Sequence, residues 1–220
     1  MNRIYLVRHG ENYANITKEF SYKLVDYDLT EKGIKQAQQT AKYFESQNID
    51  EIYSSPLKRA IQTAELISKQ IEKYNEVIEE FRELNVGDLE KTKPDKQSWD
   101  IYFKVTNDWY SGIRESKFPN GEDFFTLYDR FMKGLAYITH NKDNKNIVVV
   151  GHGGIFTASI LDLCVIKDRQ EFVNKQNHNC SISEILIDRN TEPNVHLVRW
   201  ADYSHLSGEA ACFMNGLPER

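Results

Sequence analysis

The sequence is poor in cysteine, with three among 220 residues: Cys164, Cys180 and Cys212. Their number is odd, and their spacing contains neither a C-x-x-C pair nor a zinc-ligand pattern. We therefore expect a reducing, cytoplasmic setting. No apolar run approaches the roughly 20 residues of a membrane span, and the N-terminus lacks the apolar region and cleavage site of a signal peptide. A membrane partner is not expected.

Strong charge of one sign is also absent. The formal net charge is −5 and the charged residues are interspersed, so the chain has no basic stripe of the kind that nucleic-acid binding needs. DNA, RNA and anionic membrane surfaces are therefore poor partner candidates. A few arginines that converge on one cleft can still bind an anionic substrate, because the local field matters more than net charge there.

The chain is long enough for one buried core, since 40% of its residues are hydrophobic and 12% are aromatic. Repeats, low-complexity tracts and linkers are absent, so we expect a single domain over residues 1–220. Residues from about 92 to 120 interrupt the regular pattern with aromatic side chains among Lys and Asp, and residues 118–121 (Phe-Pro-Asn-Gly) mark a turn. We interpret residues 92–120 as an inserted helical lid.

Short apolar, β-branched runs predict the strands. The runs at residues 3–8 and 147–150 are typical of strands buried on both sides of a parallel sheet. Another strand is predicted at residues 52–53, and two more at residues 182–187 and 195–198, joined by a turn-rich segment. These strands are expected to share one central sheet.

Helical patterns separate the strands. One helix is predicted after the cap residue Thr30, with an apolar face that comprises Ile34, Ala37, Ala41 and Phe44. A second is predicted to begin at Pro56, after the capping side chain of Ser55. The pattern predicts an α/β fold with a mainly parallel central sheet flanked by helices on both faces. Ligand sites of such sheets lie beyond the carboxyl ends of the strands.

Two histidines occupy equivalent positions at strand ends. His9 follows the first strand directly after Arg8, and His152 follows the strand at residues 147–150. If these strands are neighbours, both histidines stand side by side at one cleft. Arg59, in the first turn of the helix predicted from residue 56, then lies near the same cleft. Each histidine precedes a glycine, which lets the backbone approach a ligand closely.

Other interpretations stay open for these residues taken singly. A histidine at a strand end often only packs or hydrogen-bonds, and Arg59 alone could be an exposed helix residue. Zinc would need a tight His-x-x-x-His or clustered Cys/His spacing, which is missing. A Walker loop is missing too, because neither Lys-Ser nor Lys-Thr follows the glycines after His152. The joint placement of Arg and His favours a phosphate site without a metal.

The sequence around His9 resembles a known signature. Residues 6–11 (Leu-Val-Arg-His-Gly-Glu), with Asn15, look like the signature of the histidine phosphatase superfamily, also called the phosphoglycerate mutase-like family. Similar blocks follow in the expected order over nearly the whole chain, at residues 28–37, 54–64, 82–87, 121–123, 150–154 and 179–182. Each block alone is weak, whereas the ordered set is specific.

The resemblance implies the phosphoglycerate mutase-like fold and a phosphohistidine mechanism without metal or cofactor. His9 would attack phosphorus through a neutral ring nitrogen while its other nitrogen donates to a backbone carbonyl. Arg8, Arg59 and His152 would surround the phosphoryl oxygens and stabilise their charge. Glu83 matches the family's proton donor, and its carboxylate would then activate the hydrolytic water; a solvated surface charge is the alternative.

Further positions of the signature carry weaker expectations. Asn15 would add a neutral donor to the phosphate site, and Gly153 would line it. Glu11 would pair with an Arg or His of the site, or else be an exposed loop carboxylate. Two departures affect the specificity surface: Glu90 is followed by Lys where the family often has Gly, and Phe156 stands where mutases commonly place polar or basic residues.

The expected function is hydrolysis of a small phosphorylated metabolite. A mutase must hold its substrate in two orientations with extra cationic groups, and this chain has no two adjacent arginines. Phosphoglycerate mutase remains the alternative, together with a non-catalytic phosphate-binding or interaction protein, against which the presence of both His9 and Glu83 argues. Aromatic residues of the lid suit a stacked ring or the lid's own core, and its lysines suit a second anionic group. A homodimer stays open.

Overall fold

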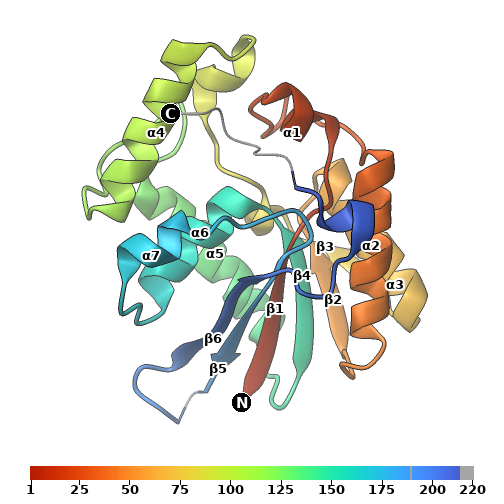
Figure 1. The fold of residues 1–220 in the computed structure, drawn as a ribbon. Helices are drawn as coiled ribbons and strands as arrows, with labels where there is room; N and C mark the ends of the chain where they lie inside the picture. The colour runs from red at the N-terminus through yellow and green to blue at the C-terminus, as the bar shows by residue number, and fades with distance from the viewer. Residues whose placement is uncertain (189, 214–220) are drawn as a thin grey trace.

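The computed structural model describes residues 1–188 and 190–213 and has a central sheet between two helical layers (Figure 1). Within these residues, six strands form one sheet in the order β3-β2-β4-β1-β5-β6. The strands are β1 (Asn2–Arg8), β2 (Glu51–Ser54), β3 (Asn75–Val77), β4 (Asn146–Gly151), β5 (Ile182–Ile187) and β6 (Val195–Asp202). The first four run parallel, and β5 is antiparallel to both of its neighbours. The mainly parallel sheet is therefore confirmed.

Helices cover both faces of this sheet. They are α1 (Tyr13–Thr17), α2 (Glu31–Phe44), α3 (Lys58–Ile71), α4 (Lys96–Tyr110), α5 (Phe124–Thr139), α6 (Gly153–Leu163) and α7 (Arg169–Asn174), with short 3-10 turns η1 (Glu79–Phe81), η2 (Gly87–Lys91) and η3 (Gly208–Ala211). In Figure 1, α2 and α3 lie on one side of the sheet, and α5 and α6 lie on the other. Among the described residues, no helix is long and apolar enough to cross a membrane.

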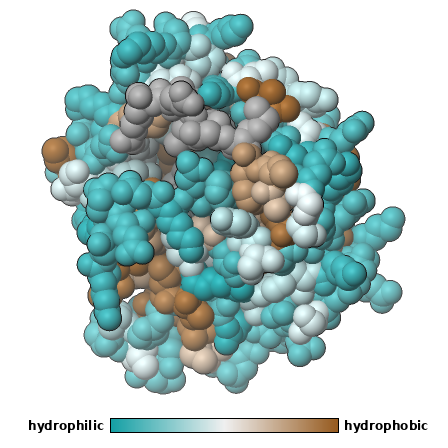
Figure 2. All heavy atoms as spheres, in the orientation of Figure 1, coloured by the Kyte–Doolittle hydropathy of each residue, from teal (hydrophilic) through white to brown (hydrophobic). Residues whose placement is uncertain are grey.

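The side chains of β1 explain why both faces are covered. Tyr5 and Val7 pack into the core beneath α2 and α3, whereas Ile4 and Leu6 belong to the core beneath α5 and α6. Full burial of one such aliphatic side chain contributes about 1.5–3 kcal/mol to folding. The face drawn in Figure 2 is mainly hydrophilic, with apolar side chains only in small patches. The apolar runs of the sequence thus contribute to two hydrophobic cores, one on each face of the sheet.

The structure confirms one of the two predicted helix starts and corrects the other. Thr30 caps α2 as predicted, because its side chain accepts a hydrogen bond from the N–H of Gly33. The prediction that Ile34 is part of the buried face is wrong, since that side chain is 41% exposed. The predicted start of α3 is also wrong: the helix begins at Lys58 rather than Pro56, without a side-chain cap. The hydroxyl of Ser55 instead contacts His152 at 2.7 Å.

The region predicted as a lid contains α4, followed by a turn in which Gly121 N–H donates to the carbonyl of Phe118 at 2.9 Å. The aromatic side chains of α4 divide into two groups. Trp109 is fully buried and packs edge-on against Phe118. Trp99 and Tyr102 contact the ring of Phe20, and they also line a cavity at the carboxyl ends of the parallel strands. This part of the chain thus contributes both to the core and to a cavity wall.

Candidate active site

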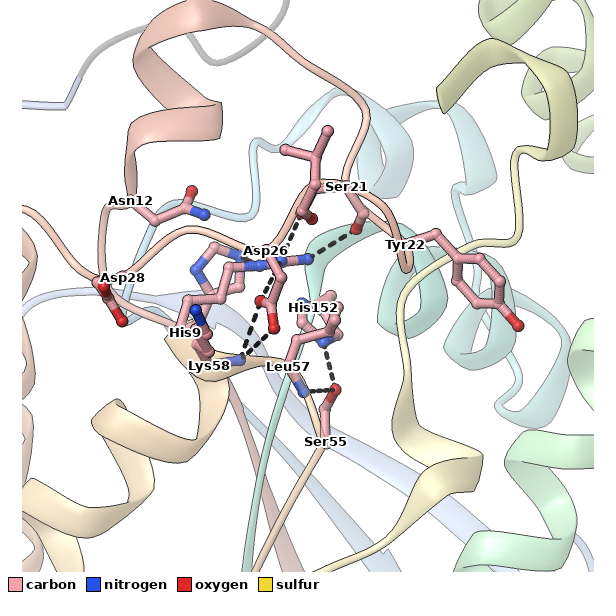
Figure 3. A network of polar contacts seen from close by, with 12 residues as sticks. His9, Asn12, Ser21, Tyr22, Asp26, Asp28, Ser55, Leu57, Lys58 and His152 are labelled. Atoms are coloured by element: carbon pink, nitrogen blue, oxygen red, sulfur yellow. Dashed lines mark hydrogen bonds and ion pairs between the residues drawn. The ribbon is translucent and has the colours of Figure 1, made fainter. Parts of the chain in front are cut away.

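His9 and His152 lie side by side because β1 and β4 are paired in parallel. Arg8 is in register with Gly151, so the residue that follows each strand reaches the same edge of the sheet. Both imidazoles are buried, and their ring centroids are 5.2 Å apart. Figure 3 shows the polar contacts around this pair. The sheet register thus brings together two residues separated by 143 positions.

The hydrogen bonds of His9 define its tautomer. Nδ1 lies 2.7 Å from the carbonyl oxygen of Gly10, which can only accept, and Nε2 lies 3.1 Å from Nε of Arg59, which can only donate. Nδ1 therefore carries the proton, and Nε2 presents a lone pair. Burial, reinforced by Arg59 and Arg8, holds the pKa of His9 well below its usual value, so the ring is neutral near pH 7.

Arg59 is held in the first turn of α3 by an outer loop. Its Nη1 donates to Ser21 Oγ at 2.7 Å, and its Nη2 donates to the carbonyl of Ser21 at 3.0 Å. Asp26 approaches to 4.0 Å. Burial lowers the pKa of Arg59 to about 10, which leaves it charged at neutral pH. Three of its five N–H groups are thus fixed by His9 and Ser21, and the remaining two can serve an anion.

Arg8 adds a second guanidinium at the end of β1. Its Nη1 donates to the carbonyl of Asn177, and its buried Nε has no hydrogen-bond partner among the described residues. Burial lowers the pKa of Arg8, while the negative charge of Glu83 raises it. Arg8, like Arg59, lines the cavity. The two guanidiniums therefore offer unused donors to the space next to His9.

His152 lies fully buried beside His9. Its Nε2 is 2.7 Å from Ser55 Oγ, and its Nδ1 has no hydrogen-bond partner among residues 1–188 and 190–213. Burial is the largest cause that lowers its pKa well below the usual histidine value, and the charge of Arg59 acts in the same direction. His152 is thus a neutral ring with one unsatisfied nitrogen.

Glu83 sits over the first turn of α6. Its carboxylate accepts hydrogen bonds from the N–H groups of Gly154 at 3.1 Å, Ile155 at 2.9 Å and its own neighbour Leu84 at 2.9 Å. Free N–H groups at a helix start favour a negative charge there. A Cβ at Gly154 would lie 2.7 Å from the Glu83 oxygen, so a larger residue there would displace the carboxylate from this position. Glu83 lines the cavity and is not a fully solvated surface charge.

The backbone on either side of Glu83 is clamped by Arg130. The guanidinium donates to the carbonyls of Glu80 at 2.9 Å, Arg82 at 2.6 Å and Glu83 at 3.0 Å. It also forms two hydrogen bonds to the buried carboxylate of Glu122, at 2.8 and 3.0 Å. A planar guanidinium is suited to such a fixed, multidentate role. Arg130 thereby fixes the position from which Glu83 reaches the cavity.

The weaker expectations have mixed outcomes. Asn15 lines the cavity, and its Oδ1 accepts from Asn179 Nδ2 at 3.1 Å, which leaves the Asn15 amide N–H groups as donors. Gly153 lines the cavity as the first residue of α6, where backbone N–H groups have no partner within the helix. Both expectations for Glu11 are wrong: it is buried, and it pairs with Lys32 at 2.6 Å rather than with an Arg or His.

Phe156 and the cationic residues of the segment 92–120 lie outside the cavity lining. Phe156 is fully buried in the core. Lys96 pairs with Asp100 at 2.7 Å, and Lys104 pairs with Asp108 at 2.6 Å, on the outside of α4. The lysines of residues 92–120, which were expected to suit a second anionic group, do not line the cavity.

The cavity itself has a volume of about 260 Å³ and is lined in part by residues of α1 and α4. Its wall on α4 is aromatic, and its lysines are Lys18 and Lys175 from other segments. Among the described residues, no group of three or more His, Cys, Asp or Glu is placed to hold a metal ion. The arrangement is a small cavity lined by the neutral imidazole of His9, the guanidinium groups of Arg8 and Arg59 and, on α4, several aromatic side chains.

Residues 4–202 match the model of the histidine phosphatase superfamily, branch 1. The chain belongs to this superfamily. It is 30% identical to the uncharacterized phosphatase PhoE of Bacillus subtilis over 74% of this chain and 78% of that protein. It is 31% identical to a protein of Erwinia tasmaniensis named "Probable phosphoglycerate mutase GpmB", over 84% of this chain and 85% of that protein.

A solved structure supports the same assignment. A mutant of the phosphoserine phosphatase of Entamoeba histolytica, in complex with phosphoserine, superimposes with a TM-score of 0.74 at 27% identity, over 94% of this chain and 100% of that chain. The structure of the phosphatase with 3-phosphoglyceric acid gives the same values. The fold is that of histidine phosphatases, and the chain is an enzyme of the phosphatase type.

Several residues that shape this histidine phosphatase site escaped prediction. Ser21 has no local signal, because its contact with Arg59 joins a loop to a helix 38 residues away. Glu90 was noticed only for the lysine after it, yet its carboxylate is buried and accepts hydrogen bonds from four consecutive backbone N–H groups, those of residues 22–25. Ser55 resembled a helix cap. Arg130 was not singled out, and its contacts with the backbone before and after Glu83 join segments 47 to 50 residues apart.

Proposed function

We propose that this chain hydrolyses phosphomonoesters of small metabolites through a phosphohistidine on His9, without a metal ion. The observation that carries the proposal is the tautomer of His9. Its proton is fixed on Nδ1 by Gly10, so a neutral Nε2 lone pair stands among buried cationic groups. Such a nitrogen is a nucleophile, and the surrounding donors bind the group that it attacks.

In the first step, Nε2 of His9 forms a bond to phosphorus while the bond from phosphorus to the leaving oxygen breaks. Protonated Glu83 gives its proton to that oxygen, so the product leaves as an alcohol. Arg8, Arg59 and His152 donate to the three equatorial oxygens, where negative charge is spread in the transition state. The N–H of Gly153 and the amide of Asn15 supply neutral donors to the same oxygens.

In the second step, water attacks the phosphohistidine. The carboxylate of Glu83 takes one proton of the water, the bond between Nε2 and phosphorus breaks, and inorganic phosphate forms. The electron pair returns to Nε2 of His9, and Glu83 is protonated again for the next cycle. The charge-neutralising role assigned to Mg²⁺ in kinases is supplied here by two fixed arginines.

Two observations favour hydrolysis over the mutase reaction. The chain has no adjacent arginines, and the residues of α4 that line the cavity are aromatic or neutral polar, so α4 supplies no cation to hold a substrate in a second orientation. A cavity of about 260 Å³ suits a small metabolite. The phosphoserine and 3-phosphoglyceric acid bound by the Entamoeba histolytica enzyme are of that size class.

The test is to trap the intermediate. Enzyme quenched during turnover of ³²P-labelled p-nitrophenyl phosphate should carry an acid-labile, base-stable label on His9, in buffer that contains excess EDTA. His9→Ala should lose label and turnover, whereas the exposed His140→Ala should keep both. Label on another residue, or activity that EDTA abolishes and a divalent ion restores, would overturn the proposal.

A second measurement separates hydrolase from mutase. The enzyme is incubated with 3-phosphoglycerate, with and without 2,3-bisphosphoglycerate, and inorganic phosphate and 2-phosphoglycerate are both followed. Release of phosphate should exceed formation of 2-phosphoglycerate. Isomerisation far faster than phosphate release would identify a mutase while leaving the phosphohistidine intact.

A further inference from the structure

We propose that Ser55 is a positioning residue: its hydroxyl proton is donated to Nε2 of His152, which fixes the proton of the ring on Nδ1 for donation to the phosphoryl group. The inference rests on the proposed function, since it gives His152 the role of a phosphoryl donor. It assigns to Ser55 a task that its helix-capping sequence context does not suggest.

The position of Ser55 Oγ is fixed from three directions. Ser55 follows β2 directly, is completely buried, and anchors its backbone through an N–H bond to the carbonyl of Val150 at 2.9 Å. Its Oγ accepts a long hydrogen bond from Leu57 N–H at 3.4 Å and lies 2.7 Å from His152 Nε2. Figure 3 shows Ser55 next to the His152 ring, with dashed lines that join its hydroxyl to His152 and to Leu57.

The donors and acceptors around Ser55 Oγ decide the direction of its hydrogen bond with His152. Leu57 N–H already uses Oγ as an acceptor, and among the described residues His152 Nε2 is the one acceptor within reach of the Ser55 hydroxyl. If Nε2 carried the ring proton, the hydroxyl proton would be buried without an acceptor, which costs free energy. If Ser55 donates, every polar atom of its hydroxyl is satisfied.

The ring holds one proton, because burial and the nearby Arg59 lower the pKa of His152 well below its usual value. If Nε2 carries no proton, the single proton of the neutral ring is therefore on Nδ1. Nδ1 is buried, without a partner among the described residues, in a ring 5.2 Å from that of His9. A phosphoryl oxygen bound at His9 would satisfy this N–H, whereas the opposite tautomer would turn a lone pair toward the oxygen.

The direct readout is the ¹⁵N NMR spectrum of the histidine rings, which distinguishes protonated from bare nitrogens. The His152 signals are assigned by their loss in His152→Asn. In the wild-type protein with saturating inorganic phosphate, Nδ1 should be protonated and Nε2 bare. In Ser55→Ala, the Nε2-protonated form should appear, and kcat for p-nitrophenyl phosphate should fall by roughly 10²-fold, as for loss of one transition-state donor.

Two variants control for a merely structural effect. Ser55→Thr restores the hydroxyl and should recover the wild-type tautomer and most of the turnover. Ser159→Ala removes a hydroxyl that is equally buried but has no hydrogen-bond partner among the described residues, and it should leave both readouts unchanged.

The inference is overturned if wild-type His152 carries its proton on Nε2 with phosphate bound, or if Ser55→Ala keeps both the tautomer and kcat. Should Ser55→Ala fail to fold, the wild-type spectrum and Ser55→Thr still decide it. Failure of the proposed function is a separate outcome, read from the label on His9. A labelled His9 beside an Nε2-protonated His152 would reject only the role of Ser55.

Discussion

Arg59 donates its Nε–H to Nε2 of His9 at 3.1 Å, so a guanidinium contacts the nitrogen that is proposed to attack phosphorus. Burial, with the positive charge of Arg59 acting in the same direction, lowers the pKa of His9 and keeps the ring neutral. The two Nη atoms of the same guanidinium are held by Ser21. Arg59 thus links the loop around Ser21 to the proposed nucleophile, and we expect its planar geometry to matter as much as its charge.

Replacing Arg59 with lysine tests this point. Arg59→Lys keeps the positive charge but loses the planar fork that contacts His9 and Ser21 together. Each charge-assisted hydrogen bond is worth about 1.5–3 kcal/mol, so kcat/KM should fall by roughly 10²–10³-fold. The neighbouring, exposed Lys58→Arg is the matched control and should stay near wild type. Equal kinetics for Arg59→Lys and wild type would show that charge alone suffices.

Glu83→Gln should separate proton transfer from phosphoryl transfer. Glutamine keeps the size of the side chain but has no titratable proton, so turnover of alkyl phosphates should fall by roughly 10²–10⁴-fold. The burst of p-nitrophenol from p-nitrophenyl phosphate should fall much less, because that leaving group needs no proton, and labelled enzyme should accumulate. The exposed Glu79→Gln is the control. An equal loss of burst rate for good and poor leaving groups would contradict the acid role.

The sequence predicted those features whose causes are local or repeated along the chain. The doubly buried β1 and β4 show as apolar runs, and their shared register then places His9 beside His152. The start of α3 was missed because a tertiary contact between Ser55 and His152 outweighs the local capping pattern. Glu11 was misassigned because its partner Lys32 belongs to a helix that only the fold brings near. Contacts between distant segments leave no periodic signal.

Glu90 illustrates such a contact and gives a third prediction. Its carboxylate accepts N–H bonds from Tyr22 at 2.6 Å, Leu24 at 2.9 Å and Val25 at 3.1 Å, as well as from the residue between. The loop that carries Ser21 is therefore shaped around one buried acceptor. Glu90→Gln turns an NH₂ group toward some of these donors, which should cost about 1–3 kcal/mol of stability.

The kinetic consequence of Glu90→Gln follows from the link between the loop and Arg59. A displaced Ser21 releases the guanidinium, so inhibition by inorganic phosphate should weaken and kcat/KM should drop by roughly 10-fold, the equivalent of about 1.4 kcal/mol. Asp88 lies at the surface of the same 3-10 turn and pairs with Lys91. Asp88→Asn should therefore change neither the inhibition by inorganic phosphate nor kcat/KM. Loss of stability with unchanged phosphate inhibition would assign Glu90 to the fold alone.

The buried histidines predict how stability depends on pH. Burial lowers the pKa of His205, which contacts Thr40 outside the active site, to about 4, and it lowers the pKa values of His9 and His152 as well. An unfolded histidine has a pKa near 6.5, so below that pH the unfolded chain binds more protons and the fold loses stability. Paired carboxylates such as Asp50, whose pKa is lowered, lose their contribution only in more acidic solution. Urea unfolding should therefore show a nearly constant free energy between pH 7 and 8 and a decline from pH 6.5 to 5, of at most about 1.4 kcal/mol per pH unit for each such histidine. His205→Gln should make this decline shallower, and an unchanged slope in that variant would show that His205 does not stay neutral in the folded protein.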